Sequence, residues 1–177
     1  PVPIDLPENL MVSVSGVRGR VADPLTPELM AGIAASFGTF MLGERGDGPI
    51  CVARDSRTSG PMFSRAVIAG LQSVGVDVVD LGVVPTPTLL LAVEDSEAIG
   101  GMCVTASHNP AQWNALKLVD SEGIFLDADL SGRFRVALTS REPKRAAWDA
   151  LGEVTTDADA WARHLEEIVA LPHLDVP

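Results

Sequence analysis

The chain alternates between the hydrophobic spacing of strands and that of helices, and this alternation limits its fold more than any other feature. Continuous apolar runs predict strands at residues 10–14, 50–53, 76–81, 99–105 and 115–119. Helical spacing predicts helices at residues 27–43, 59–74 and 128–138, with a shorter one within 83–95. Strands that alternate with helices predict an α/β layered domain with a mainly parallel, mixed sheet flanked by helices.

Punctuating residues locate several of these boundaries. Thr26 and Pro27 are typical of a helix start, and Gly43 favours its end. The sequence DSEG lies between apolar residues 115–119 and 124–126, which predicts a hairpin at an edge of the sheet. The charged segment 139–155 is expected to be a loop.

The C-terminal part of the chain is expected to lead out of this domain. Residues 1–155 of the 177-residue chain would form the domain, and residues 156–177 a helix and a linker toward a second domain. Thr156 would cap that helix, and Trp161, Leu165 and Ile168 would share one face. The sequence LPHLDVP has the composition of a linker.

Composition argues against several classes of protein. A formal net charge of -11 disfavours a nucleic-acid partner, because such binding needs clustered Lys and Arg. No uncharged apolar stretch reaches about 18 residues, and the N-terminus does not resemble a signal peptide, so we expect no membrane span and a cytoplasmic location. Cys51 and Cys103 lie inside apolar runs, which favours two buried free thiols over a disulfide, and no motif predicts a structural zinc site.

Three polar clusters follow predicted strands. The first, Ser13 to Val21, contains Arg18 and Arg20 between glycines. A glycine loop with arginines suits a phosphate, although a glycine turn with solvated arginines explains the same residues. The second cluster, Ala53 to Gly60, contains Arg57 between a strand and a helix, where anions often bind. Alternatively, it is a capping loop in which Ser56, Thr58 or Ser59 caps the helix and Asp55 pairs with an arginine.

The third cluster is Ser107-His108-Asn109-Pro110, at the end of the most apolar strand. An exposed Ser107 could act as a nucleophile, but no GxSxG elbow surrounds it, so a serine hydrolase is disfavoured. An ordinary Asx or ST turn is the simple alternative. Taken together, the arginines of the first two clusters (Arg18, Arg20, Arg54 and Arg57) and Lys117 indicate a site for a phosphorylated ligand around Ser107.

Four stretches closely resemble the first domain of the α-D-phosphohexomutases, the family of phosphoglucomutase, phosphomannomutase and phosphoglucosamine mutase. They are SVSGVRGRV followed by LTPEL, VARDSRTSG, AGLQSVGVDVVDLGVVPTPTL and TASHNPAQWNALKLVDSEGIFL. The resemblance implies that Ser107 is a phosphoserine that exchanges its phosphoryl group with a hexose phosphate. A bisphosphorylated sugar would be the intermediate and activator, and the net reaction would interconvert hexose 1-phosphate and 6-phosphate.

The same resemblance implies roles for further residues. Arg18, Lys117 and His108 would line the reacting centre, with Lys117 a candidate general acid or base. Arg57 and Asn109 would contribute to phosphate binding, as would Arg18 and Lys117. Magnesium would be held partly by an oxygen of Ser107.

Two departures from the family pattern shape these expectations. The usual N-G-x-K appears as Asn114-Ala115-Leu116-Lys117, and the metal loop D-x-D-x-x-R of the second domain is absent. The nearest look-alike, DADLSGR at residues 127–133, has the wrong spacing. We therefore expect roughly the first third of a phosphohexomutase, which binds magnesium only with its remaining domains and is inactive alone.

The expected partners are a phosphorylated hexose and those remaining domains. Apolar surface left open without them could make the fragment dimerise. A non-catalytic module that binds sugar phosphates is the alternative function.

Overall fold

The computed structural model describes residues 4–14 and 16–172. These residues form one seven-stranded sheet in the order β1-β2-β6-β5-β3-β4-β7. The strands are β1 (Met11–Ser13), β2 (Gly16–Arg20), β3 (Ile50–Arg54), β4 (Val78–Val83), β5 (Gly100–Val104), β6 (Trp113–Val119) and β7 (Val154–Thr156). The helices are α1 (Pro27–Arg45), α2 (Gly60–Gln72), α3 (Thr86–Glu94), α4 (Ala128–Ser140) and α5 (Ala160–Val169).

The sheet has a parallel half and an antiparallel half. Strands β5, β3, β4 and β7 pair in parallel, whereas β1, β2, β6 and β5 pair in antiparallel fashion. The α/β layered fold with a mixed sheet is thus confirmed, and in the described residues the two kinds of pairing contribute equally. Because β3 and β5 are adjacent and parallel, the loops after them leave the sheet at the same edge.

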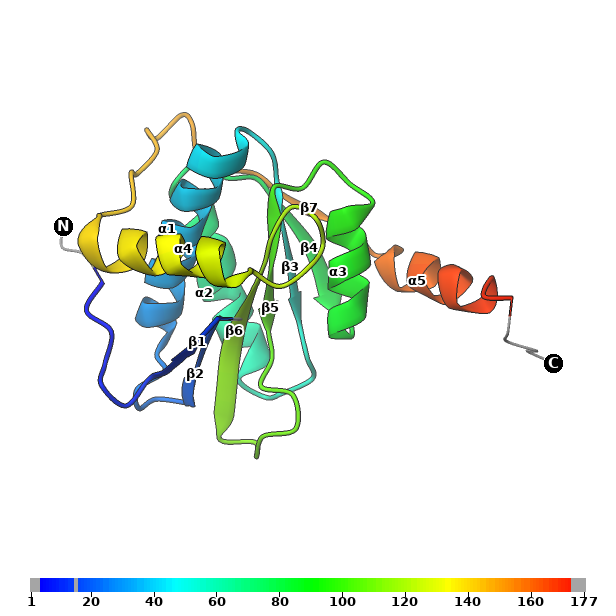
Figure 1. Cartoon of the computed structure of the whole chain (residues 1–177), viewed down its shortest axis with the longest axis horizontal. Coiled ribbons are helices and arrows are strands. Elements are labelled where there is room, and N and C mark those ends of the chain that lie inside the picture. Colours follow the sequence, from blue (N-terminus) through cyan, green and yellow to red (C-terminus); the bar gives the residue numbers. More distant parts are fainter. Residues whose placement is uncertain (1–3, 15, 173–177) are drawn as a thin grey trace.

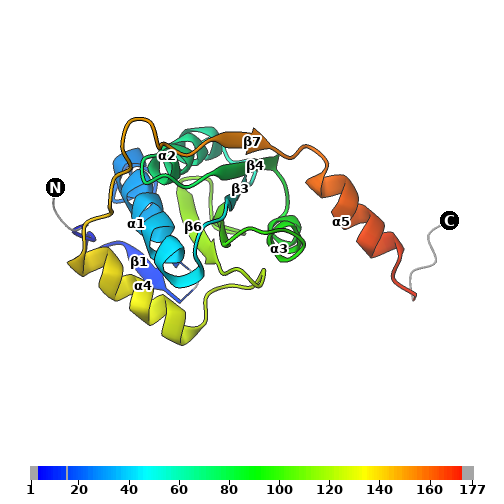
Figure 2. The same cartoon turned by 90° about the horizontal axis from the view of Figure 1, so that it is seen from above.

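Helices cover the sheet on both faces (Figures 1 and 2). Side chains from α1, α2 and α4 pack with alternate strand residues into the larger core, which contains Phe37, Phe63 and Leu116. On the other face, α3 supplies Leu89 and Val93 to a smaller cluster. Both faces of the central strands are therefore buried, which explains why Gly100–Val104 is apolar throughout.

Local signals placed the first helix well. The side chain of Thr26 accepts a hydrogen bond from the backbone N–H of Leu29 at 3.3 Å, which confirms the predicted cap. Helix α1 nevertheless continues past Gly43 to Arg45, and Gly46 is its C-cap. A glycine can end a helix but does not oblige it to end, and packing of α1 on α2 and α4 outweighs its low helix propensity.

Three expectations along the chain were wrong. The predicted loop at Ser13 to Val21 contains β2, so the edge hairpin is formed by β1 and β2. Residues 124–126 form no strand, and only a single bridge joins Val119 to Phe125, because β2 already pairs with β6 on that side.

The third correction concerns the C-terminal segment. Thr156 belongs to β7 rather than capping a helix, and Asp159 is the N-cap of α5. The short β7 had no apolar run to reveal it, since all of its residues are exposed. It includes residues on both sides of the expected division after residue 155, and that division remains a prediction. Of the expected linker, residues 173–177 lie outside the described part.

No helix within the described ranges is long and apolar enough to cross a membrane. Cys51 and Cys103 are buried free thiols, as expected. Burial raises the pKa of each thiol from 9.0 to about 11, so both are protonated at neutral pH.

Candidate functional site

The loop between β5 and β6, residues 105–112, is called here the serine loop. Ser107 lies near its start and is exposed, with a left-handed backbone angle φ of 55°. Its hydroxyl lies 3.3 Å from Nδ1 of His108. The serine that follows the apolar strand thus presents its oxygen to solvent beside an imidazole, a contact that adjacency in the sequence alone does not require.

A turn inside the loop orients Ser107. The backbone N–H of Ser107 donates to Oγ1 of Thr105 at 3.1 Å, and the N–H of Asn109 donates to the carbonyl of Ala106 at 3.1 Å. The simple alternative of an ST turn is therefore present, and it coexists with the exposed hydroxyl. Thr105 was not singled out from the sequence, because a threonine at the end of an apolar strand carries no distinctive signal.

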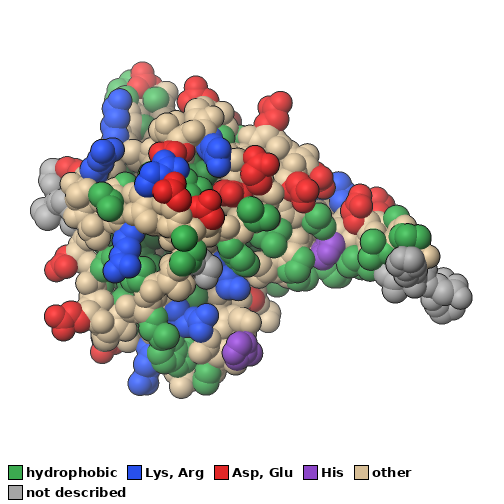
Figure 3. All heavy atoms as spheres, viewed as in Figure 1, with side chains coloured by type: hydrophobic (Ala, Val, Ile, Leu, Met, Phe, Trp, Pro, Cys, Tyr) green, Lys and Arg blue, Asp and Glu red, His purple; other side chains and the backbone are tan. Residues whose placement is uncertain are grey.

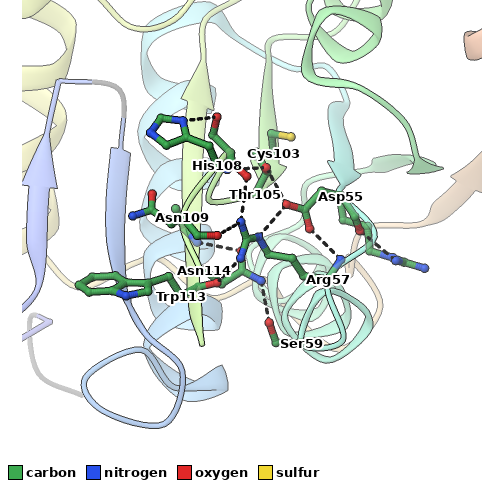
Figure 4. A network of polar contacts seen from close by, with 12 residues as sticks. Asp55, Arg57, Ser59, Cys103, Thr105, His108, Asn109, Trp113 and Asn114 are labelled. Carbon is green, nitrogen blue, oxygen red and sulfur yellow. Dashed lines mark hydrogen bonds and ion pairs between the residues drawn. The ribbon is translucent and has the colours of Figure 1, made fainter. Parts of the chain in front are cut away.

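Arg57 comes from the loop between β3 and α2 and joins the serine loop (Figure 4). Its side chain is 12% exposed and forms an ion pair with Asp55 at 3.0 Å. The rest of its guanidinium donates to four backbone carbonyls, those of Ser107 at 2.8 Å, Asn109 at 2.7 Å, Pro110 at 2.8 Å and Trp113 at 3.1 Å. The alternative in which Asp55 pairs with an arginine is therefore correct. Arg57 has no N–H left for a phosphate in this geometry.

Arg18 and Lys117 occupy neighbouring positions in the antiparallel half of the sheet. Arg18 on β2 is opposite Ala115 on β6, and Gly16 is opposite Lys117. Both side chains lie on the face that α3 covers further along the sheet, because Val17 and Leu116 point into the core on the opposite face. The predicted glycine loop is thus a strand, but it still brings Arg18 and Lys117 together.

Lys117 is half-buried between the sheet and a loop. It is opposite Cys103 on β5, and its ammonium lies 5.1 Å from the ring centroid of Phe125. Arg18 lies across β6 from the start of the serine loop, since the N–H of Thr105 donates to the carbonyl of Ala115 at 3.1 Å. These cations therefore border the loop that carries Ser107.

Asn114 shows why alanine is acceptable in the Asn114-Ala115-Leu116-Lys117 sequence. The four residues lie within β6, and Ala115 has no positive φ, so the position does not require glycine. Asn114 is buried and donates to the hydroxyl of Ser59 at 2.9 Å, which joins β6 to the start of α2. Ser59 makes no side-chain cap for that helix, contrary to one of the alternatives.

Asn109 is the last of the predicted site residues and lies in the serine loop. The carbonyl of Asn109 binds Arg57, whereas its side-chain Oδ1 is buried and has no hydrogen-bond partner among the described residues. A second histidine, His164, lies on α5, and its Nδ1 is 2.8 Å from Oγ1 of Thr88 on α3 rather than in contact with the serine loop. His173 lies outside the described residues.

Charge is unevenly distributed around the site (Figure 3). Most acidic side chains of the face shown lie in its upper part, with several Lys and Arg side chains at the upper left; further Lys and Arg side chains and a histidine lie in its lower part, with some acidic side chains at the lower left. Lys and Arg side chains are thus present in the lower part of this face although the formal net charge is -11, and nearby cations suit an anionic ligand.

The surroundings of Ser107 are open. A groove of about 640 Å³ lies between α1 and α4 and contains no residue of the serine loop. Among the described residues, no group of three or more His, Cys, Asp or Glu side chains could hold a metal ion.

Comparisons with known proteins agree with this geometry. The profile described as phosphoglucomutase/phosphomannomutase, alpha/beta/alpha domain I, matches residues 10–168. A phosphoglucomutase/phosphomannomutase of Thermococcus kodakarensis is 39% identical over 140 residues, which cover 78% of this chain and 31% of that protein. A protein of Pyrococcus abyssi named "Probable phosphoglucosamine mutase" is 34% identical over 161 residues, which cover 91% of this chain and 35% of its own length.

Solved structures show the same fold. A phosphoglucomutase/phosphomannomutase family protein from Burkholderia thailandensis matches with a TM-score of 0.76 and 29% identity, over 94% of this chain and 38% of that one. The Paramecium protein pp63/parafusin matches with a TM-score of 0.69 at 15% identity, which shows the fold alone. The chain spans about a third of the length of the curated relatives described above.

Proposed function

Because the chain belongs to the phosphoglucomutase/phosphomannomutase family, as its α/β/α domain I, we propose that Ser107 relays a phosphoryl group between two positions of a hexose. The observation that carries this proposal is the exposed Ser107 hydroxyl on a loop whose backbone is anchored by Arg57 beside Arg18 and Lys117. Phosphoryl transfer depends on positioning and on neutralisation of charge, and this arrangement offers both.

The proposed reaction has two balanced halves. The bond between phosphorus and Oγ of Ser107 breaks and Oγ takes up a proton, while a sugar hydroxyl forms a new bond to phosphorus and gives its proton to a base. The bisphosphorylated sugar then reorients, and its other phosphoryl group transfers to Oγ of Ser107. In this second half the Ser107 hydroxyl gives its proton to a base, and the released sugar oxygen takes up a proton. The net result exchanges hexose 1-phosphate and hexose 6-phosphate.

The basic residues would act on this phosphoryl group. Arg18 would neutralise charge on its equatorial oxygens, and Lys117 would move the proton of the sugar hydroxyl. His108, at 3.3 Å from Oγ of Ser107, would hydrogen-bond the same centre. Asn109 would contribute to phosphate binding through its amide.

Magnesium would find one ligand in this chain. The exposed oxygen of Ser107 suits a hard cation, whereas both carboxylate oxygens of Asp55 already accept hydrogen bonds from Arg57 and Thr105. The other ligands would come from the remaining domains. When bound, the ion would offset negative charge on the phosphoryl group.

The rest of the enzyme would complete the site. Relatives are about three times as long as the matched part, so we propose that further domains supply the metal loop and choose the hexose. The isolated 177 residues would then show no mutase turnover. We also propose a cytoplasmic location, where the free thiols of Cys51 and Cys103 would stay reduced.

The test is whether Ser107 takes up phosphate. The chain joined to the further domains proposed above is exposed to a hexose 1,6-bisphosphate and magnesium, and intact-mass and peptide mass spectrometry follow it over time. We expect one phosphate on Ser107, none in Ser107→Ala, and full uptake in Ser56→Ala, which removes another exposed serine from the adjacent loop. Binding of the sugar bisphosphate without phosphate on Ser107 would favour the non-catalytic binding module.

A further inference from the structure

Every donor of the Arg57 guanidinium is used inside the protein. A guanidinium has five N–H groups. One bonds Asp55, and the other four bond carbonyls that come from the serine loop and from Trp113 at its end. The side chain is only 12% exposed, and its hydrogen bonds are charge-assisted, which makes them stronger than bonds between neutral groups.

Asp55 extends this arrangement to the amide of Ser107. Its Oδ1 accepts from the backbone N–H of Arg57 at 3.0 Å, and its Oδ2 accepts from the hydroxyl of Thr105 at 2.8 Å. The same Thr105 oxygen accepts from the N–H of Ser107 at 3.1 Å. Ser107 is therefore held at both ends of its backbone, through its N–H by Thr105 and through its carbonyl by Arg57.

Such restraint has a specific need at Ser107. Its φ of 55° is a left-handed conformation that is unfavourable for a residue with a side chain. An exposed loop without further bonds would relax from it. The two-sided anchoring explains how a serine keeps this conformation while its hydroxyl remains open to solvent.

We propose that Arg57 is a positioning residue, which fixes the place of the Ser107 oxygen for phosphoryl transfer and binds no phosphate itself. The part that concerns transfer rests on the proposed function, whereas the part that concerns loop geometry does not. Asp55 and Thr105 act with Arg57, since they tie it to the amide of Ser107.

The consequence for kinetics is a separation of rate from binding. Without the hydrogen bonds of the Arg57 guanidinium, Oγ of Ser107 would be displaced by about 1 Å, and such a displacement typically lowers the rate about 100-fold. The affinity for a sugar bisphosphate would change little, because no Arg57 donor faces the ligand. Removal of a phosphate ligand would instead weaken binding, so the two roles are distinguishable.

The experiment uses Arg57→Lys, Arg57→Ala and the matched control Arg65→Ala, which removes an exposed arginine from α2. Lysine keeps the charge but cannot span four carbonyls. The first readout is amide hydrogen exchange of Ser107 and Asn109 by NMR, relative to amides of α1. We expect about tenfold or faster exchange in both Arg57 variants and no change in the control.

The second readout is phosphate uptake by Ser107 from a hexose 1,6-bisphosphate at several concentrations, with the parent and variant chains joined to the further domains proposed above. We expect the maximal rate to fall about 100-fold in both Arg57 variants, with half-saturation within about threefold of the parent protein. Added guanidinium ion at millimolar concentration should restore part of the rate in Arg57→Ala and none in Ser107→Ala.

Each outcome decides the proposal. Unchanged exchange at Ser107 and Asn109 overturns it, as does failure of both variants to fold, which would make Arg57 a residue of the fold. A weakened half-saturation at an unchanged maximal rate would make Arg57 a phosphate ligand instead. If the parent protein takes up no phosphate, the relay function fails, and hydrogen exchange still decides the positioning of the loop.

Discussion

At the scale of single residues, Ser107 combines an unfavourable backbone conformation with a chemically useful place. Its φ of 55° turns the chain sharply after the buried strand β5, which leaves the hydroxyl at the surface. Glycine would adopt this φ without steric cost but would have no hydroxyl. The conformation is therefore maintained at some cost in stability by bonds from neighbouring loops.

Replacement of Ser107 by glycine should relieve this cost. We expect Ser107→Gly to be more stable than Ser107→Ala by about 1 kcal/mol in urea denaturation, because both lack the hydroxyl and only alanine opposes the left-handed φ. The matched control is Ala162→Gly in the exposed interior of α5, which should lose about 1 kcal/mol. Equal stability of the two Ser107 variants would show that this φ carries no cost.

The two buried thiols predict an alkaline limit to stability. Burial raises the pKa of Cys51 and Cys103 from 9.0 to about 11, so the folded state keeps two protons that the unfolded state loses near pH 9. The free energy of unfolding should fall between pH 9 and 11, by on the order of 2 kcal/mol per thiol at the top of this window. The double variant Cys51→Ala/Cys103→Ala should show a flatter curve.

The measurement is chemical denaturation in the presence of a reductant at each pH. The sequence has no tyrosine, so the remaining side chains that titrate in this window are the lysines, which both proteins share. Parallel curves for the two proteins would contradict a role for the thiols.

At the scale of elements, helices α1 and α2 on one face of the sheet pack very closely against each other. Gly70 on α2 faces α1, and a Cβ there would lie 2.3 Å from the carbonyl oxygen of Ala31. Gly132 on α4 has nothing within 4 Å of the same position. The close approach of α1 therefore requires a glycine at position 70, whereas no neighbouring atom requires one at position 132.

Alanine substitutions at the two glycines should change the stability of the protein in opposite directions. We expect Gly70→Ala to destabilise the protein by about 2 kcal/mol or more, because α1 and α2 must move apart. Gly132→Ala should stabilise it by about 0.5–1 kcal/mol through its helix propensity. Thermal unfolding by circular dichroism measures both, and a stable Gly70→Ala variant would contradict the close packing described for α1 and α2.

At the scale of the whole molecule, α5 extends away from the sheet (Figure 1) and carries exposed apolar side chains. Trp161 and Leu165, which the sequence predicted to share one helix face, are 43% and 44% exposed. Of α5, only Ala160 is buried among the described residues. Exposed apolar surface was expected where further domains would pack, and dimerisation of the fragment through such a surface remains a prediction.

Solution mass tests that prediction. Light scattering at high micromolar concentration should give the mass of two chains for the parent protein and of one chain for Trp161→Glu/Leu165→Glu. Trp148→Glu is the control, since Trp148 is 87% exposed and lies outside α5. A parent protein that stays monomeric would exclude this surface as a dimer interface.

Several features of the fold and the site were predictable because their signals are local. The cap at Thr26 and the helical spacing after it predict α1, and the fully apolar run at Gly100–Val104 predicts a strand buried on both faces. Elements with weak local signals were missed, namely β2 inside a glycine-rich segment and the three exposed residues of β7. Their partners in the sheet are what make them strands.

The sequence by itself determined which residues end the strands of the α/β layers, and so which side chains could meet at one edge. Only the tertiary structure decided what each of them does there. Arg57 is the clearest case. Its guanidinium donates hydrogen bonds to the carbonyls of Ser107, Asn109, Pro110 and Trp113, which lie about fifty positions away along the chain. Hydrogen bonds to backbone carbonyls leave no trace in the type of the residues that offer them, so an arginine that anchors a loop and one that binds phosphate look alike in sequence.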